Sequence, residues 1–152
     1  MQRDKHLLSD LKLKLTHHAL RPVYRVDHSE KPIAAGKGRH KDFILIEGRR
    51  NLEQAVIMRL LTPRGDLTQL GHPEYGSRVH ELIGSGNTDT NRNRLKLFIL
   101  ESLKRERRIE KVKELVVTPS PGRRSTVDVV LKVIPVEFAD VVEIGPFRIE
   151  LG

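Results

Sequence analysis

Four glutamates are the side chains of this sequence best suited to acid–base chemistry: Glu74, Glu81, Glu101 and Glu106. A glycosidase needs two carboxyl groups about 5 Å or roughly 6.5 to 9.5 Å apart, one of them in an apolar pocket that raises its pKa. Glu101 instead falls on the polar side of a predicted helix, one turn from Lys104 and Arg105, which favours a solvated ion pair. We therefore predict no catalytic residue and no enzyme activity. A muralytic enzyme, which cleaves cell-wall glycans, is the least favoured of the three functions that the sequence suggests.

Metal and cofactor chemistry finds little support either. His80-Glu81-Leu82-Ile83-Gly84 begins like the helix of a zinc protease, but Gly84 stands where the second histidine ligand would be. The chain has no cysteine, which excludes a disulfide framework, a thiolate nucleophile and Cys-ligated zinc. We expect no metal and no cofactor.

The positive charge of the chain is concentrated near its beginning. The formal net charge is +8, and residues 1–41 hold ten Lys/Arg against four acidic residues. Five of the seven histidines lie there too, among prolines and glycines that favour turns. We predict a basic N-terminal arm with short strands over residues 1–41 and a compact domain over residues 42–152.

A second basic region supports an alternative function. Residues 92–113 carry nine Lys/Arg against three glutamates, and a nucleic-acid-binding domain could place such a helix on phosphates. Aromatic residues make up only 4% of the chain, which leaves few platforms for stacking bases. A solvated charged helix face explains most of these residues, so specific nucleic-acid binding is only the second hypothesis.

Hydrophobic periodicity predicts an α+β fold, with a small mixed or antiparallel sheet packed against two or three helices. Alternation of apolar and polar residues favours strands, and one-turn spacing of apolar residues favours helices. We predict strands near residues 11–15, 22–26, a buried one at 43–46, then 112–117, 127–133 and 141–149. Helices are predicted near residues 52–60, starting at about Asn51, then 79–83, and a longer one after a cap at Thr88 or Thr90.

Four segments in order resemble a known assembly module. They are Asn51-Leu52-Glu53-Gln54-Ala55, Leu60 to Asp66 with Pro63 and Gly65, Pro73-Glu74-Tyr75-Gly76, and Ile99 to Ile109 with Glu106-Arg107-Arg108. This order resembles the W-type wedge or "lysozyme-like" sheath-initiator family of contractile phage tails, tailocins and contractile injection systems. The resemblance implies a structural baseplate component that starts sheath polymerisation and whose fold resembles the strand-exchanging domain of sheath proteins.

The resemblance is sharpest at the end of the long helix. The family carries Glu-Pro-Arg there, and the resemblance implies that these residues dock the protein onto the wedge; they correspond to Glu106, Arg107 and Arg108. Position 107 departs from the pattern, and arginine restores a backbone N–H that proline lacks. The loop at Pro73-Glu74-Tyr75-Gly76 is expected to be structural.

Strand exchange is the mechanism that the resemblance implies, because an added strand gains affinity from backbone hydrogen bonds. Leu11, Leu13 and Leu15 alternate with Lys12 and Lys14 and are the predicted partner-binding side of an exchangeable strand. An ordinary edge strand of the chain's own fold explains the same alternation equally well. The expected partners are wedge and baseplate proteins, the sheath protein and the inner tube or hub region, with several copies around the tail axis.

No stretch is apolar enough to span a membrane. We expect the protein in the cytoplasm of the producing bacterial or archaeal cell and then in the baseplate of the particle.

Overall fold

The computed structural model describes residues 8–18, 21–32, 39–136 and 139–152, with the backbone alone at 15–18, 21–24, 30–32 and 39–41. The chain is an α+β protein, as predicted, and forms two compact units, residues 1–54 (unit 1) and 55–152 (unit 2). The division falls within helix α1 (Gly48–Leu61).

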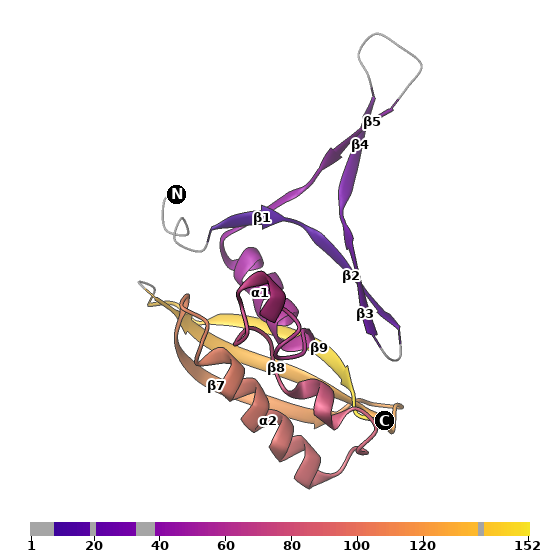
Figure 1. The fold of residues 1–152 in the computed structure, drawn as a ribbon, viewed down its shortest axis with the longest axis vertical. Coiled ribbons are helices and arrows are strands. Elements are labelled where there is room, and N and C mark those ends of the chain that lie inside the picture. Colours follow the sequence, from indigo (N-terminus) through magenta and orange to yellow (C-terminus); the bar gives the residue numbers. More distant parts are fainter. Residues whose placement is uncertain (1–7, 19–20, 33–38, 137–138) are drawn as a thin grey trace. The chain divides into compact units, whose positions relative to one another are not determined.

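The described strands of unit 1 form three two-stranded antiparallel ribbons, which Figure 1 shows as three arms extending from one point. The ribbons pair β1 (Ser9–Leu11) with β6 (Leu45–Glu47), β2 (Leu13–His18) with β3 (Arg21–Val26), and β4 (His28–Pro32) with β5 (Arg39–Phe43). A two-stranded ribbon is marginally stable by itself in water, so the point where the arms meet has to hold the unit together.

A closed ring of three backbone hydrogen bonds forms that junction. The amide of Lys12 donates to the carbonyl of Ile44 at 2.8 Å, Ile44 donates to Asp27 at 3.3 Å, and Asp27 donates to Lys12 at 2.7 Å. The side chain of Asp27 is 6% exposed, and its carboxylate pairs with Lys12 and Lys14 at 2.9 and 3.1 Å. The hydrogen bonds and ion pairs to the Lys12 and Lys14 ammonium groups lower the pKa of Asp27.

Two predictions for this region were wrong in detail. The alternating segment at residues 11–15 is not one strand, because the chain turns at Lys12 from one ribbon into the next. The segment at 43–46 is not a buried strand either, since the side chains of Phe43 and Leu45 are 65% and 63% exposed. It belongs to two strands that meet at Ile44, and the described side chains of both strands are exposed or half-buried.

Unit 2 is built on an antiparallel sheet with the order β7-β8-β9, formed by β7 (Ile109–Pro119), β8 (Thr126–Pro135) and β9 (Val142–Glu150). These strands confirm the three predicted from their period of two. In the central strand β8, every second residue is fully buried: Val127, Val129, Leu131 and Val133. The predicted turn at residues 119–122 joins the first two strands, and the amide of Ser120 donates to the carbonyl of Thr126 at 2.9 Å.

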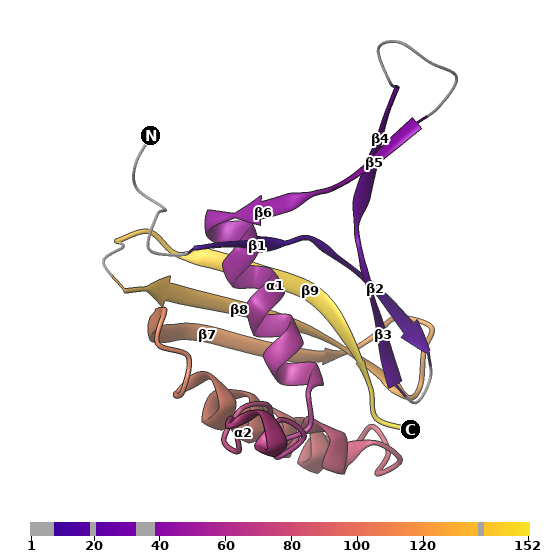
Figure 2. The same cartoon turned by 45° about the horizontal axis from the view of Figure 1, so that its top comes forward.

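Helix α2 (Asp89–Leu103) runs along β7, as Figures 1 and 2 both show. Its predicted cap is confirmed, because the hydroxyl of Thr88 accepts a hydrogen bond from the amide of Asn91 at 3.2 Å. Its apolar face buries Leu95, Phe98, Ile99 and Leu103. Two short 3-10 helices precede it, η2 (Thr68–Leu70) and η3 (Val79–Leu82), the second where a helix was predicted. In the described parts of the chain, no helix is long and apolar enough to cross a membrane.

Candidate functional site

The turn from α2 into β7 contains a buried ion pair. The carboxylate of Glu106 is 7% exposed and accepts hydrogen bonds from Nε and Nη2 of Arg108 at 2.8 and 3.2 Å. The backbone N–H of Arg108 also points at Oε1 of Glu106, at 3.3 Å. Burial raises the pKa of Glu106, but the hydrogen bonds and charge of Arg108 outweigh burial and hold that pKa below its usual range.

Helix α1 adds a second guanidinium to this cluster. Nε of Arg59 lies 3.4 Å from Oε2 of Glu106, and the guanidinium carbon lies 4.5 Å from the centre of the Tyr75 ring. This stacking is a cation–π contact, and burial raises the pKa of the Tyr75 phenol. One buried carboxylate thus holds together the end of α1, the turn after α2 and the loop that carries Tyr75.

Hydrogen bonds fix the loop that supplies Tyr75, in agreement with its expected structural role. The hydroxyl of Ser77 donates to the carbonyl of Leu60 at 2.5 Å, and the hydroxyl of Ser102 donates to the carbonyl of Gly76 at 2.9 Å. Gly76 has a φ of +100°, and a Cβ atom there would lie 2.5 Å from the carbonyl oxygen of Thr62. Only glycine fits this crossing of two backbone segments.

The three residues predicted to dock the protein onto a wedge therefore lie in different surroundings. Glu106 is buried, Arg108 is partly buried against it, and Arg107 between them is exposed. Of the three, Arg107 offers its side chain most directly to a partner, although the resemblance places proline at that position. Docking by these residues stays a prediction.

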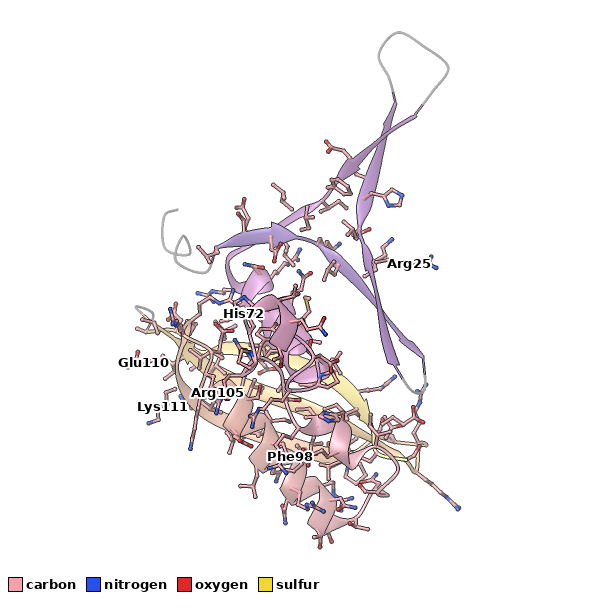
Figure 3. All side chains as sticks on the ribbon, in the orientation of Figure 1. Arg25, His72, Phe98, Arg105, Glu110 and Lys111 are labelled. Atoms are coloured by element: carbon pink, nitrogen blue, oxygen red, sulfur yellow. The ribbon has the colours of Figure 1, made fainter. Side chains whose placement is uncertain are left out.

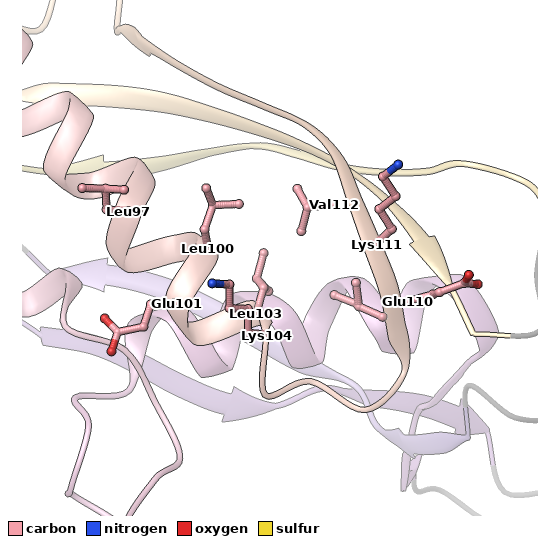
Figure 4. A pocket seen from close by; sticks show the side chains of 9 residues that line it. Leu97, Leu100, Glu101, Leu103, Lys104, Glu110, Lys111 and Val112 are labelled. Atoms are coloured by element: carbon pink, nitrogen blue, oxygen red, sulfur yellow. The ribbon is translucent and has the colours of Figure 1, made fainter.

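Beside this cluster lies an apolar groove of about 650 Å³ between α2 and the start of β7. Figure 4 shows Leu97, Leu100 and Leu103 facing it from the helix and Val112 from the strand. Ile109 and four charged residues line the rest of it: Glu101, Lys104, Glu110 and Lys111. Figure 3 shows Arg105, Glu110 and Lys111 at the same end of unit 2.

Three of the four glutamates considered for acid chemistry, Glu81, Glu101 and Glu106, have a lowered pKa. The Arg78 guanidinium lowers the pKa of Glu81, and the Arg64 guanidinium, 2.8 Å away, lowers that of Glu101. A glycosidase acid needs the opposite shift. The partner of Glu101 is therefore Arg64, from a distant segment, and not Lys104 or Arg105, which we predicted and which follow the end of α2.

The second basic region is partly neutralised within unit 2. Arg92 pairs with Asp89, Arg105 with Glu74, and Arg108 with Glu106. Guanidinium groups already paired with carboxylates are poorer phosphate ligands. His80 lies on η3 with Nδ1 3.2 Å from the carbonyl of Ser77, and the described residues contain no group of three His, Asp or Glu that could hold a metal ion.

In unit 1, the predicted strand residues are divided between two ribbons. Leu11 lies opposite Leu45, and Leu13 lies opposite Val26. The backbone of Leu15 pairs with that of Tyr24, and the Leu15 side chain lies outside the described residues. Partner binding by these leucines also stays a prediction.

Sequence reasoning missed two side chains that hold these sites, Arg59 and Gln54. Arg59 falls on the apolar stripe of its helix, at the spacing of Val56 and Leu60, and a charged residue on such a stripe signals a buried partner. Gln54 is buried and hydrogen-bonds the backbone on both sides of Lys12. No model of a known protein family matches this chain, and no curated protein matches its sequence.

Proposed function

We propose that this protein is a structural component of a contractile tail or injection machine, which docks on the baseplate wedge and initiates sheath polymerisation by strand exchange. The observation that carries the proposal is the sheet of unit 2, in which β7 and β9 both have an outer edge that pairs with no other described strand. An open edge accepts a further strand through backbone hydrogen bonds.

The central strand makes this sheet a firm platform for strand addition. β8 is fully buried on one face and is paired with a strand on each side. A rigid edge gives an incoming strand a fixed register, because a shift by one residue would move its apolar side chains to the other face. The order of motifs along the chain, from Asn51 to Ile109, resembles that of sheath initiators and supports the proposal further.

The docking half of the proposal rests on the end of α2. Exposed Arg107 lies in the turn that the Glu106–Arg108 ion pair closes. The neighbouring apolar groove supplies surface that a wedge helix could cover.

The test is removal of the protein from a producing cell, followed by electron microscopy of the particles. We expect tubes without sheath, and restoration of sheathed particles by the full chain. A structure of the restored particle should place a sheath strand beside β7 or β9. Sheathed particles in the absence of the protein would refute initiation. Salt-dependent, sequence-specific DNA or RNA binding would favour the nucleic-acid alternative, and clearing of peptidoglycan would favour the muralytic one.

A further inference from the structure

Three equivalent backbone corners surround the junction of unit 1, at Lys12, Asp27 and Ile44. Each of these residues directs both its N–H and its C=O into the junction, as a residue of a hydrogen-bonded ladder pair does, but its two bonds go to two different partners. In such a ladder the next pair along has its N–H and C=O groups pointing away from the ribbon. Those next pairs are Leu11 with Leu45, Leu13 with Val26, and His28 with Phe43. Each corner therefore presents the carbonyl of the residue before it and the amide of the residue after it.

At the Lys12 corner, the side chain of Gln54 satisfies both groups. The amide of Leu13 donates to Oε1 of Gln54 at 2.8 Å, and Nε2 of Gln54 donates to the carbonyl of Leu11 at 2.9 Å. A carboxamide has the same donor and acceptor as a peptide group. Unit 1 thus contains an example of the ligand that such a corner binds.

The Asp27 corner satisfies its amide locally. The carboxylate of Asp27 accepts a hydrogen bond from the amide of His28 at 3.1 Å. The His28 amide needs no outside acceptor, because the Asp27 side chain already accepts its hydrogen bond.

At the Ile44 corner, neither a glutamine from another segment nor the corner's own side chain forms hydrogen bonds with the two backbone groups. Its central side chain is a hydrocarbon, and no hydrogen bond joins the carbonyl of Phe43 or the amide of Leu45 to another described residue. On both sides of these groups lie the exposed side chains of Phe43 and Leu45. Two open backbone groups between two exposed apolar side chains make a short strand-binding site.

We propose that the Ile44 corner binds an extended, acidic segment of a different protein, in which one peptide or carboxamide group takes the place that Gln54 takes at Lys12. Apolar side chains of that segment cover Phe43 and Leu45. Residues 39–50 around the corner carry four Lys/Arg against two acidic residues, which favours an acidic partner. A second copy of the chain would bring another net charge of +8, which opposes self-association here. The corner belongs to unit 1 and the sheath proposal rests on unit 2, so either can fail without the other.

Two synthetic peptides and the full chain test this proposal. Each peptide is about eight residues long, a typical strand length, and has valines around a central glutamine. One peptide has glutamate at the alternate positions and the other has lysine. We expect the glutamate peptide to bind about tenfold more tightly at low salt. It should also slow hydrogen exchange at the amide of Leu45 in the ¹⁵N-labelled chain by about tenfold.

Two substitutions and a matched control locate the binding. Leu45→Pro removes the outward N–H without removing a ladder hydrogen bond, and Phe43→Ser removes the apolar cover. Both should abolish binding of the glutamate peptide. Leu70→Ser removes a side chain that is 72% exposed in unit 2 and should leave binding unchanged.

Several results would overturn the proposal. Equal affinity for the two peptides would contradict the proposal that the partner is acidic. Hydrogen exchange of the Leu45 amide that stays fast with bound peptide would show that the peptide does not bind at the Ile44 corner. Sedimentation of the free chain as a dimer that Phe43→Ser dissociates would assign the surface to a second copy. The exchange measurement on the unaltered chain decides the question even if a substitution unfolds unit 1.

Discussion

The guanidinium of Arg108 and the carboxylate of Glu106, two residues apart in the chain, are joined by two hydrogen bonds of 2.8 and 3.2 Å. The pair closes the turn between α2 and β7, and the carboxylate is almost entirely buried. A buried carboxylate is tolerated only while it is paired and hydrogen-bonded. These two residues therefore stabilise the fold in addition to any role in docking.

The Arg108→Glu variant should unfold more easily than the unaltered chain. Treated as a surface residue, Arg108 would contribute within about 0.5 kcal/mol. Because its loss leaves Glu106 without its main partner, we expect the free energy of unfolding to fall by about 3 kcal/mol. Urea unfolding monitored by circular dichroism measures this. A variant as stable as the unaltered chain would show that Arg59 alone suffices for Glu106.

Arg107→Glu provides the clean test of docking. The side chain of Arg107 is exposed, so the reversal should change stability by no more than about 0.5 kcal/mol. If this turn contacts the wedge, the variant should be missing from purified particles while the monomer stays folded. Arg123→Glu, another exposed arginine, in the turn before β8, is the matched control. Normal incorporation of the Arg107 variant would remove this residue from the docking surface.

Acid should destabilise the protein through the same pair. The pKa of Glu106 is lower in the folded chain than in the unfolded chain. Its contribution is therefore fully present above the unfolded pKa of about 4.3 and is lost as the pH falls through the lower, folded pKa. Asp27, Glu81, Glu101 and Glu114 are shifted in the same direction. Unfolding measured from pH 6 downward should show stability falling below about pH 4.3, less steeply in Glu106→Gln.

The sheet of unit 2 could be predicted because the alternation of apolar and polar residues along its strands matches the alternation of buried and exposed side chains. Val127, Val129, Leu131 and Val133 alternate with less buried residues, and that period exists only in a strand with one buried face. The junction of unit 1 could not be predicted in the same way. The alternation from Leu11 to Leu15 is unbroken in sequence, yet the chain turns at Lys12 because its backbone bonds go to Ile44 and Asp27.

The candidate site shows the same division between local and distant information. Thr88 could be identified as a helix cap because the cap and the helix it begins are neighbours in sequence. The partners of Glu106 and Glu101 include Arg59 and Arg64, which come from a segment about forty residues earlier. Charge spacing along one helix favours nearest neighbours, and it therefore gave the wrong partner for Glu101.

Gly76→Ala should be strongly destabilising. The new Cβ atom would lie 2.5 and 2.8 Å from the carbonyl oxygens of Thr62 and Pro63, in a residue with positive φ. We expect a loss of more than about 3 kcal/mol, since backbone strain adds to a clash that no side chain can relieve. Gly71→Ala is the matched control, because its φ is also positive but nothing lies within 4 Å of the added atom. It should cost only about 1 kcal/mol, and equal melting temperatures for the two variants would contradict the close approach at Gly76.

Gln54→Ala should leave the backbone groups of the Lys12 corner without their hydrogen-bond partner, and it therefore tests the role of Gln54 in unit 1. The substitution removes both hydrogen bonds to the backbone of Leu11 and Leu13. At about 1 kcal/mol for each bond, exchange of the Leu13 amide should become roughly tenfold to a few hundredfold faster. The amide of Leu45, which lacks such a partner among the described residues, should exchange rapidly in both proteins. Hydrogen exchange followed by NMR compares the two amides in one experiment. If Leu13 exchanges equally fast with and without Gln54, the carboxamide does not close this corner in solution, and its use as a template for a partner at Ile44 fails as well.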